Sequence, residues 1–144
     1  MIPLYLLDTN ILIHYARRNE VGEEIESRYQ LFTTPTVPLV SYVSEAEARA
    51  FATFRYWGEP ALTQLSFLFS IFRIVPMDSP DLLTAYIEIG VYSRRKGFRM
   101  GKNDLWIAAT ARVTGATILT TDQDFDHLNS ILLQRDYIAL SESK

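Results

Sequence analysis

The sequence predicts an α/β domain in which a mostly parallel sheet is covered by helices on both faces. Short apolar runs typical of buried strands alternate with longer segments of helical periodicity, which is the pattern of such sheets. No repeat, linker or low-complexity tract interrupts residues 1–144, so a single domain is expected. The hydrophobic fraction of 48% and the charged fraction of 22% are ordinary for a globular protein with a hydrophobic core.

Five runs are expected to form strands: residues 3–7, 37–42, 74–77, 116–120 and 131–133. The fourth run, ATILT, is rich in the β-branched residues that favour strands. Right-handed crossovers place the carboxyl ends of parallel strands along one edge of the sheet. The functional crevice of such a sheet lies at that edge.

Seven segments are expected to be helical: residues 10–18, 20–32, 44–57, 61–72, 79–96, 103–114 and 122–128. Asp8 or Thr9 can cap the first segment, and Ser44 can open the third. Gly97 and Gly115 follow the fifth and sixth segments, and glycine commonly ends a helix.

The composition excludes several classes of protein. Because the chain has no cysteine, a disulfide scaffold, a thiolate zinc site and a cysteine nucleophile are excluded, and a reducing cytoplasm is the expected location. The first ten residues lack the basic start of a secretory signal. The most apolar stretch, residues 61–75, is too short and too polar to span a membrane. The net charge of -3 argues against a uniformly basic surface for nucleic acid, but it leaves room for a local basic face.

Several catalytic motifs are absent as well. The chain has neither the G-x-x-x-x-G-K phosphate loop nor the G-x-S-x-G nucleophile motif. His14 lies in an apolar helical segment and His127 in an acidic one. We expect structural roles for both histidines rather than a pair that exchanges protons with a substrate.

Four acidic residues fall where predicted strands end or predicted helices begin. Asp8 directly follows the first strand, and Asp122 directly follows the strand run ATILTT. Asp104 and Glu47 lie in the first turns of two helices. Although these residues are far apart in the sequence, a doubly wound sheet brings such positions together at one edge.

Each acid also has a structural explanation. Asp8 can cap a helix, and Ser44 with Glu47 matches the capping box S-x-x-E. Asp104 and Asp122 suit the positive ends of helices. Capping does not require apolar flanks, however, and two of the acids stand within LYLLDTNILI and NDLWIAATA. Carboxylates gathered in such surroundings repel one another and lose solvation, and a divalent cation would relieve both effects.

The type of ligand favours Mg²⁺ or Mn²⁺. The candidate ligands are carboxylate oxygens in a chain with no cysteine and two histidines. Such a group of acids can hold one ion or two, and a pair of ions would lie about 3.5–4 Å apart. The chemistry that suits this site is hydrolysis of a phosphodiester by an activated water that attacks in line.

Four segments together resemble the motifs of PIN domains. They are LLDTNILI, the acid in SEAEARAF, GKNDLWIAATA and ILTTDQDF, and they extend over residues 4–125. Their order and the chain length resemble most closely the VapC-type toxins of bacterial toxin–antitoxin systems. The resemblance implies a three-layer α/β/α sandwich with a mostly parallel sheet of four to five strands. It also implies a Mg²⁺- or Mn²⁺-dependent endoribonuclease, often a homodimer, that a cognate antitoxin inhibits.

Matching these motifs residue by residue gives the expected catalytic set: Asp8, Glu47, Asp104 and Asp122. All of them except Glu47 match the acids of the family's metal site. The family usually has apolar residues just before its glutamate, whereas Glu45 stands there in this chain, so Glu45 is an alternative. Asp124 either joins the site or lies on its rim.

Four polar residues next to the acids are expected to hydrogen-bond the carboxylates and fix their conformations: Thr9, Asn10, Asn103 and Thr120. Ordinary capping and turn roles fit the same residues equally well.

A basic segment, RRKGFRMGK, leads directly into the Asp104 motif. We expect its cations to hold an RNA backbone, with these residues in contact: Arg95, Lys96, Arg99 and Lys102. The alternative is a solvated helix end whose cations interact with the helix dipole. Residues 51–72 are dense in aromatic side chains, and those not needed for the core are expected to form an antitoxin or dimer surface.

Two other classes of protein are alternatives to the ribonuclease. Phosphoaspartyl receivers need an acid pair after the first strand, where Asp8 stands alone, and the haloacid-dehalogenase pattern needs an acid or threonine at the position of Asn10. A catalytically inactive PIN-like module that binds RNA or protein is the remaining alternative. The presence of all four acids argues against it.

Overall fold

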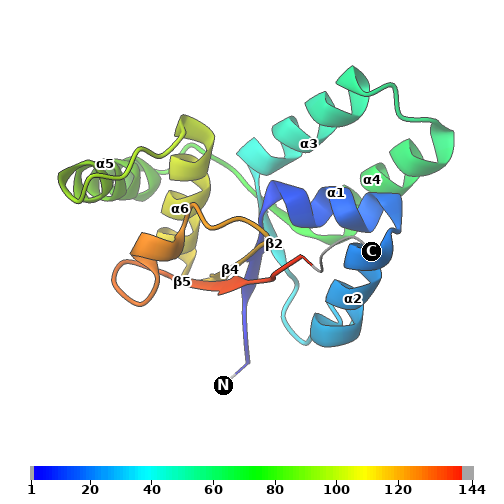
Figure 1. Ribbon diagram of the computed structural model, residues 1–144, viewed down its shortest axis with the longest axis horizontal. Helices are drawn as coiled ribbons and strands as arrows, with labels where there is room; N and C mark the ends of the chain where they lie inside the picture. Colours follow the sequence, from blue (N-terminus) through cyan, green and yellow to red (C-terminus); the bar gives the residue numbers. More distant parts are fainter. Residues whose placement is uncertain (1, 141–144) are drawn as a thin grey trace.

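A five-stranded parallel sheet lies between two layers of helices in the computed structural model, which describes residues 2–140 (Figure 1). The strands are β1 (Tyr5–Leu7), β2 (Leu39–Ser41), β3 (Arg73–Val75), β4 (Thr117–Thr120) and β5 (Gln134–Tyr137). Their order across the sheet is β3-β2-β1-β4-β5, and every neighbouring pair is parallel. The predicted α/β class, with three layers and a parallel sheet, is confirmed.

Six helices cover the two faces of this sheet: α1 (Thr9–Arg17), α2 (Glu20–Tyr29), α3 (Tyr42–Phe54), α4 (Glu59–Ile71), α5 (Pro80–Arg95) and α6 (Lys102–Thr114). The first four lie on one side of the sheet and the last two on the other (Figure 1). None of the helices between residues 2 and 140 combines the length and the apolar character needed to cross a membrane.

Consecutive residues of the central strands face opposite layers. Leu6 and Ile118 belong to the core under α5 and α6, whereas Leu7 and Leu119 belong to the core under α1 to α4. Side chains alternate between the faces of a strand, so a strand buried on both faces must be apolar at every position. This requirement explains why the buried centres of β1 and β4 each show two apolar residues in succession, Leu6 with Leu7 and Ile118 with Leu119.

Most predicted strands and helices lie within two residues of their observed bounds, but β5 does not. The expected strand at residues 131–133 is wrong, because residues 130–132 form a turn and Leu133 makes only an isolated bridge with Asn129. The Ser130 amide donates to the Leu133 carbonyl at 2.7 Å, and the Leu132 amide donates to the Leu128 carbonyl at 3.1 Å. The true strand, Gln134–Tyr137, is a polar edge strand, so its sequence lacks the apolar run that predicts a buried strand.

Two helical predictions also need correction. Residues 122–128 contain only a three-residue 3₁₀ turn, Asp126–Leu128, and the residues before it form a loop in which the Asp122 and Asp124 amides donate to side-chain oxygens of Thr120 and Asp122. The helix expected from Ser44 begins at Tyr42 instead, and Ser41 caps it by accepting a hydrogen bond from the Val43 amide. The capping-box interpretation is therefore wrong.

Two helices end earlier than expected. The second ends at Tyr29 rather than at residue 32, and the third ends at Phe54 rather than at residue 57. Gln30 and Tyr56 have φ values of 50° and 54°, in the left-handed region where a helix cannot continue.

Candidate active site

Asp8 lies at the carboxyl end of β1, the central strand of the sheet. The strands β2 and β3 lie on one side of β1 and β4 and β5 on the other, so Asp8 stands where the strand order reverses, which is the usual place for a site in such sheets. One carboxylate oxygen accepts a hydrogen bond from the Thr9 amide at 2.8 Å, which caps α1. The other accepts from the Thr120 hydroxyl, also at 2.8 Å. Only 4% of Asp8 is exposed. Burial, together with the charges of Asp122 and Glu47, raises the pKa of Asp8 to about 6 despite these hydrogen bonds.

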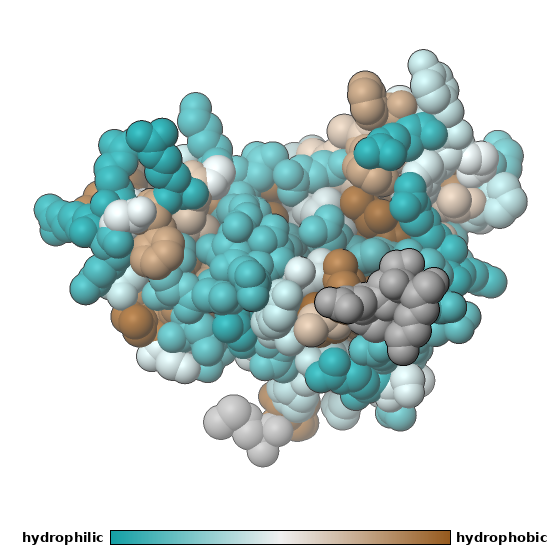
Figure 2. Space-filling view, in the orientation of Figure 1, coloured by the Kyte–Doolittle hydropathy of each residue, from teal (hydrophilic) through white to brown (hydrophobic). Residues whose placement is uncertain are grey.

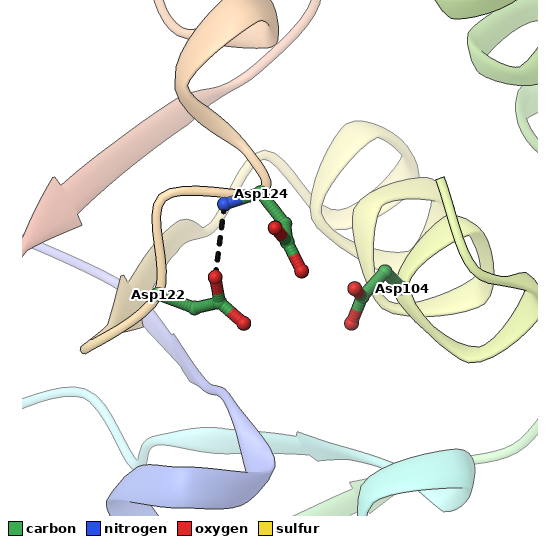
Figure 3. Close-up of side chains that lie close together, drawn as sticks. All are labelled: Asp104, Asp122 and Asp124. Atoms are coloured by element: carbon green, nitrogen blue, oxygen red, sulfur yellow. Dashed lines mark hydrogen bonds between the residues drawn. The ribbon is translucent and has the colours of Figure 1, made fainter. Parts of the chain in front are cut away.

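Asp122 and Asp124 follow β4, the strand beside β1. The Asp122 amide donates to the Thr120 hydroxyl at 2.9 Å, so Thr120 connects this loop to Asp8. The Asp122 Oδ1 atom accepts from the Asp124 amide at 3.1 Å (Figure 3). Burial and the nearby Asp124 carboxylate raise the pKa of Asp122. A short turn thereby holds two acids beside the buried Asp8.

Asp104 reaches the same place from the first turn of α6. Burial raises the pKa of Asp104 to about 8, with further contributions from a hydrogen bond to Asp124 and from the charge of Asp8. Asp104, Asp122 and Asp124 each offer a carboxylate oxygen, and these three oxygens lie within 4.8 Å of one another (Figure 3). Because none of the ion pairs in residues 2–140 involves them, their negative charge is uncompensated within the part of the chain that the structure describes.

The four acids predicted as catalytic border a single cavity of about 250 Å³. The residues that line it are Asp8, Thr9, Asn10, Ile13, Glu47, Phe51, Asp104 and Asp122. Asp124 does not line this cavity but contributes to the carboxylate cluster at its side. The donors are all carboxylate oxygens, and close acids with raised pKa values accept a hard divalent cation in place of protons. The residues therefore fit Mg²⁺ or Mn²⁺.

Glu47 is held at the cavity by hydrogen bonds to both carboxylate oxygens. The Thr9 hydroxyl lies 2.7 Å from Oε1, and the Asn103 side-chain amide donates to Oε2 at 2.8 Å. The buried Ser44 hydroxyl lies 3.1 Å from the Thr9 hydroxyl and supports this arrangement, a contact that sequence reasoning missed. Glu45 instead pairs with Arg49 along the helix at 2.9 Å. The two glutamates thus have different surroundings, and only Glu47 borders the cavity.

The other residues singled out in the sequence divide into two groups. Thr120, like Thr9 and Asn103, hydrogen-bonds an acid, whereas the exposed Asn10 lines the cavity without a side-chain bond to a carboxylate among the described residues.

Both histidines lie away from the cavity. His14 is bonded to Asn19 at 2.9 Å, and His127 is bonded to Ser93 on α5 at 2.8 Å.

The basic segment extends from the end of α5 to the start of α6, and its four predicted RNA contacts are exposed. Lys102 lies close to the acids, since it lines a second cavity of about 400 Å³ with Glu47 and Asp104. Arg99 lines a different cavity against α5, of about 750 Å³. Arg95 and Lys96 lie at the end of α5 and border neither acidic cavity. The structure therefore brings one of the four cations to the acids.

The fold and the site together define an α/β protein with a group of close carboxylates at the carboxyl edge of a parallel sheet. The chain belongs to the PIN domain family, which matches residues 5–130. The family resemblance predicted from the sequence is thereby confirmed. No curated protein matches the chain in sequence.

Solved structures with the same fold include chains of toxin–antitoxin complexes. A chain of VapBC2 from Rickettsia felis bound to a DNA fragment from its promoter is 21% identical, with a TM-score of 0.80 and coverage of 94% of this chain and 99% of that one. A chain of DNA-bound VapBC from Salmonella typhimurium is 22% identical, with a TM-score of 0.75 and coverage of 95% and 98%. VapC20 from Mycobacterium tuberculosis, a toxin that cleaves the sarcin–ricin loop, is 17% identical, with a TM-score of 0.65 and coverage of 90% and 98%. The predicted VapC-type fold is confirmed.

Proposed function

We propose that the protein is a metal-dependent endoribonuclease and the toxin of a toxin–antitoxin pair. The observation that carries this proposal is the group of three carboxylate oxygens within 4.8 Å of one another, beside the buried Asp8 and without an ion pair to any cation in residues 2–140. PIN domains are nucleases, and a structural neighbour is named as an RNA-cleaving toxin. The substrate class and the role as a toxin follow from these relatives.

Asp8, Asp104, Asp122 and Asp124 are the residues that would hold the cation, with Mg²⁺ or Mn²⁺ as the ions of matching chemistry. When bound, the cation supplies Lewis acidity toward the attacking water and neutralises negative charge at the scissile phosphate. The protein fixes the geometry in advance, because both Asp8 oxygens already accept hydrogen bonds from the fold.

Glu47 has a different role from the aspartates in this proposal. Its two oxygens each accept one hydrogen bond, which fixes the carboxylate at the cavity wall. A carboxylate has about four lone-pair positions, so Glu47 can still accept a proton from the attacking water. Thr9 and Asn103 are positioning residues that act through Glu47.

A cognate antitoxin is the proposed protein partner, because the structural neighbours come from complexes of this type. A second copy of the chain is proposed as a further partner, in a homodimer. The surface proposed for it is the outer face of α5, where Leu83, Ile87 and Val91 follow one another at four-residue intervals and are 54%, 54% and 42% exposed.

Substituting Asp104 tests the proposed function most simply. The Asp104→Asn variant keeps the size of the side chain but removes one charged ligand, and we expect RNA cleavage in Mn²⁺ to fall by about 10²-fold or more. Asp78→Asn is the matched control, since it removes an exposed acid away from the site. Gel assays of a labelled RNA with both variants give the comparison, and full activity of Asp104→Asn would refute the assignment.

A further inference from the structure

Helices α1 and α3 run side by side away from the acids and carry matching rows of side chains (Figure 1). Residues four apart share one face of a helix. Each row has a polar residue at the site, an apolar residue one turn further and an arginine after two turns. The rows are Thr9, Ile13 and Arg17 on α1, and Glu47 and Phe51 on α3 with Arg55 directly after its end. Ile13 and Phe51 line the acidic cavity, so the rows continue directly from it.

The two arginines are held against aromatic rings. The Arg17 guanidinium lies 5.5 Å from the centre of the Phe51 ring and 5.2 Å from the centre of the Trp57 ring. These two contacts connect the end of α1 to the end of α3. The Arg55 guanidinium lies 5.0 Å from the Phe51 ring. Guanidinium groups held over rings in this way lose less side-chain entropy when they bind a ligand.

Both arginines are exposed, and no ion pair within residues 2–140 involves either of them. Some other arginines do have acidic partners, as Arg49 has Glu45 and Arg112 has Glu88. Hydrophilic side chains lie directly beside apolar surface on the side of the molecule formed by α1, α3 and α4 (Figure 2). Among the described residues, Arg17 and Arg55 thus have no ion-pair partner and lie beside apolar side chains such as Phe51.

The negative charge of the acids suggests what the arginines on this surface could do. A nucleic-acid strand that enters a group of carboxylates is repelled by them, and cations beside the cavity offset that repulsion. Lys102 is one such cation on the α6 side. Arg17 and Arg55 lie on the other side, two turns from Thr9 and Glu47, or roughly 12 Å along each helix at 1.5 Å per residue.

We propose that the rows on α1 and α3 form a subsite for a single-stranded RNA segment that flanks the cleaved bond. The strand passes over Ile13 and Phe51, its phosphates contact Arg17 and Arg55, and its bases stack on the guanidinium planes. A single strand fits better than a duplex, because stacking on flat side chains requires unpaired bases. This subsite rests on the proposed function, and it lies on the side of the cavity opposite the basic segment singled out in the sequence.

The Arg17→Gln/Arg55→Gln double variant tests the subsite with a labelled single-stranded RNA of about 12 nucleotides in Mn²⁺. We expect KM to rise about tenfold while kcat changes less than about twofold, because the acids are untouched. We also expect the slope of log KM against log salt to fall by about 1.4, since each lost phosphate contact on a single strand contributes about 0.7. Fluorescence anisotropy of the same RNA with the wild type and the variant gives a second readout that does not require cleavage.

Two further variants separate charge from stacking and from loss of structure. Arg28→Gln is the matched control, because Arg28 also lies over a ring, Tyr29 at 5.4 Å, but on α2 and away from the cavity. It should leave KM and the salt slope unchanged. Arg17→Lys/Arg55→Lys keeps both charges, so it should restore the salt slope and recover KM only in part.

Unchanged KM, anisotropy and salt slope in an RNA-cleaving protein would overturn the subsite and leave the proposed function standing. A double variant that binds RNA normally but no longer copurifies with a coexpressed antitoxin would also overturn it, by assigning the surface to a protein partner. Absence of cleavage by the wild type would count against the proposed function itself, and anisotropy would still decide whether the arginines bind RNA.

Discussion

At the scale of single residues, uncharged side chains hold the acids in place: Thr120 holds Asp8, and Thr9 and Asn103 hold Glu47. The Thr120 hydroxyl donates to Asp8 and accepts from the Asp122 amide, so one buried side chain links the ends of two neighbouring strands. Glu47 is fixed by two donors from two other helices. The carboxylates are therefore oriented by the fold rather than by a cation alone, and loss of a supporting group should be measurable.

Thr120→Val keeps the shape of the side chain and removes its hydroxyl. We expect the free energy of unfolding to fall by about 1–3 kcal/mol, because a buried Asp8 oxygen and the Asp122 amide both lose a hydrogen-bond partner. Urea denaturation of the metal-free protein measures this change. Thr117→Val on the same strand is the control and should have a much smaller effect, so equal stability of the two variants would show that the Thr120 link contributes nothing.

Separate substitutions of Glu47 and Glu45 by glutamine should give very different activities. Glutamine at position 47 has one oxygen in place of two, so either Thr9 or Asn103 loses its acceptor, and we expect cleavage in Mn²⁺ to fall by about 10²-fold. Glu45→Gln loses only a surface ion pair with Arg49 and should retain nearly full activity. If only Glu45→Gln were inactive, the second motif would be aligned wrongly.

At the scale of helices and strands, the sequence predicts best those strands that are buried on both faces. Strands β1 and β4 are buried on both faces and appear as apolar runs, and Asp8 and Asp122 could be located from their ends. The turn after β4 could not be predicted, because an aspartate that accepts from the amide two residues later, as Asp122 does from Asp124, has the same sequence pattern in a turn as at a helix start. The start of α3 depends on Ser41 rather than Ser44, and both serines match the usual capping signal.

The acids at the edge of the sheet should make the stability of the metal-free protein depend on pH. The pKa of Asp8 is about 6 and that of Asp104 about 8 in the folded protein, whereas unfolded aspartate has a pKa of about 3.9. Between these values the folded protein keeps protons that the unfolded chain has lost. Stability from these groups therefore falls as pH rises from about 4 to about 8.

Thermal unfolding of metal-free wild type and Asp104→Asn at about pH 5 and about pH 8 tests this sign. We expect the variant to have the higher Tm, by a margin that is larger at the higher pH, because it lacks the repelled charge. The comparison between variants cancels the opposite contribution of His14 and His127, whose pKa values are lowered by burial. A margin that shrinks as pH rises would contradict the account, and Mn²⁺ should raise the Tm of the wild type most at the higher pH.

At the scale of the whole molecule, the parallel sheet turns distant sequence motifs into one site. Asp8 and Thr120 are 112 positions apart and yet share a hydrogen bond of 2.8 Å. The sequence could predict that the acids meet, because strand ends converge in this fold. It left open whether Asp124 joins Asp104 and Asp122, and it could not predict that Arg17 reaches Phe51 and Trp57, since those contacts depend on a turn and on helix packing.

The central claim is that RNA cleavage depends on a divalent cation held by these carboxylates. The most direct measurement is the rate of RNA cleavage by EDTA-treated protein during titration with Mn²⁺. We predict no cleavage in the chelator, return of activity as Mn²⁺ is added, and no such return in Asp104→Asn at the same concentrations. A wild-type rate that is the same in EDTA and in Mn²⁺ would contradict the account.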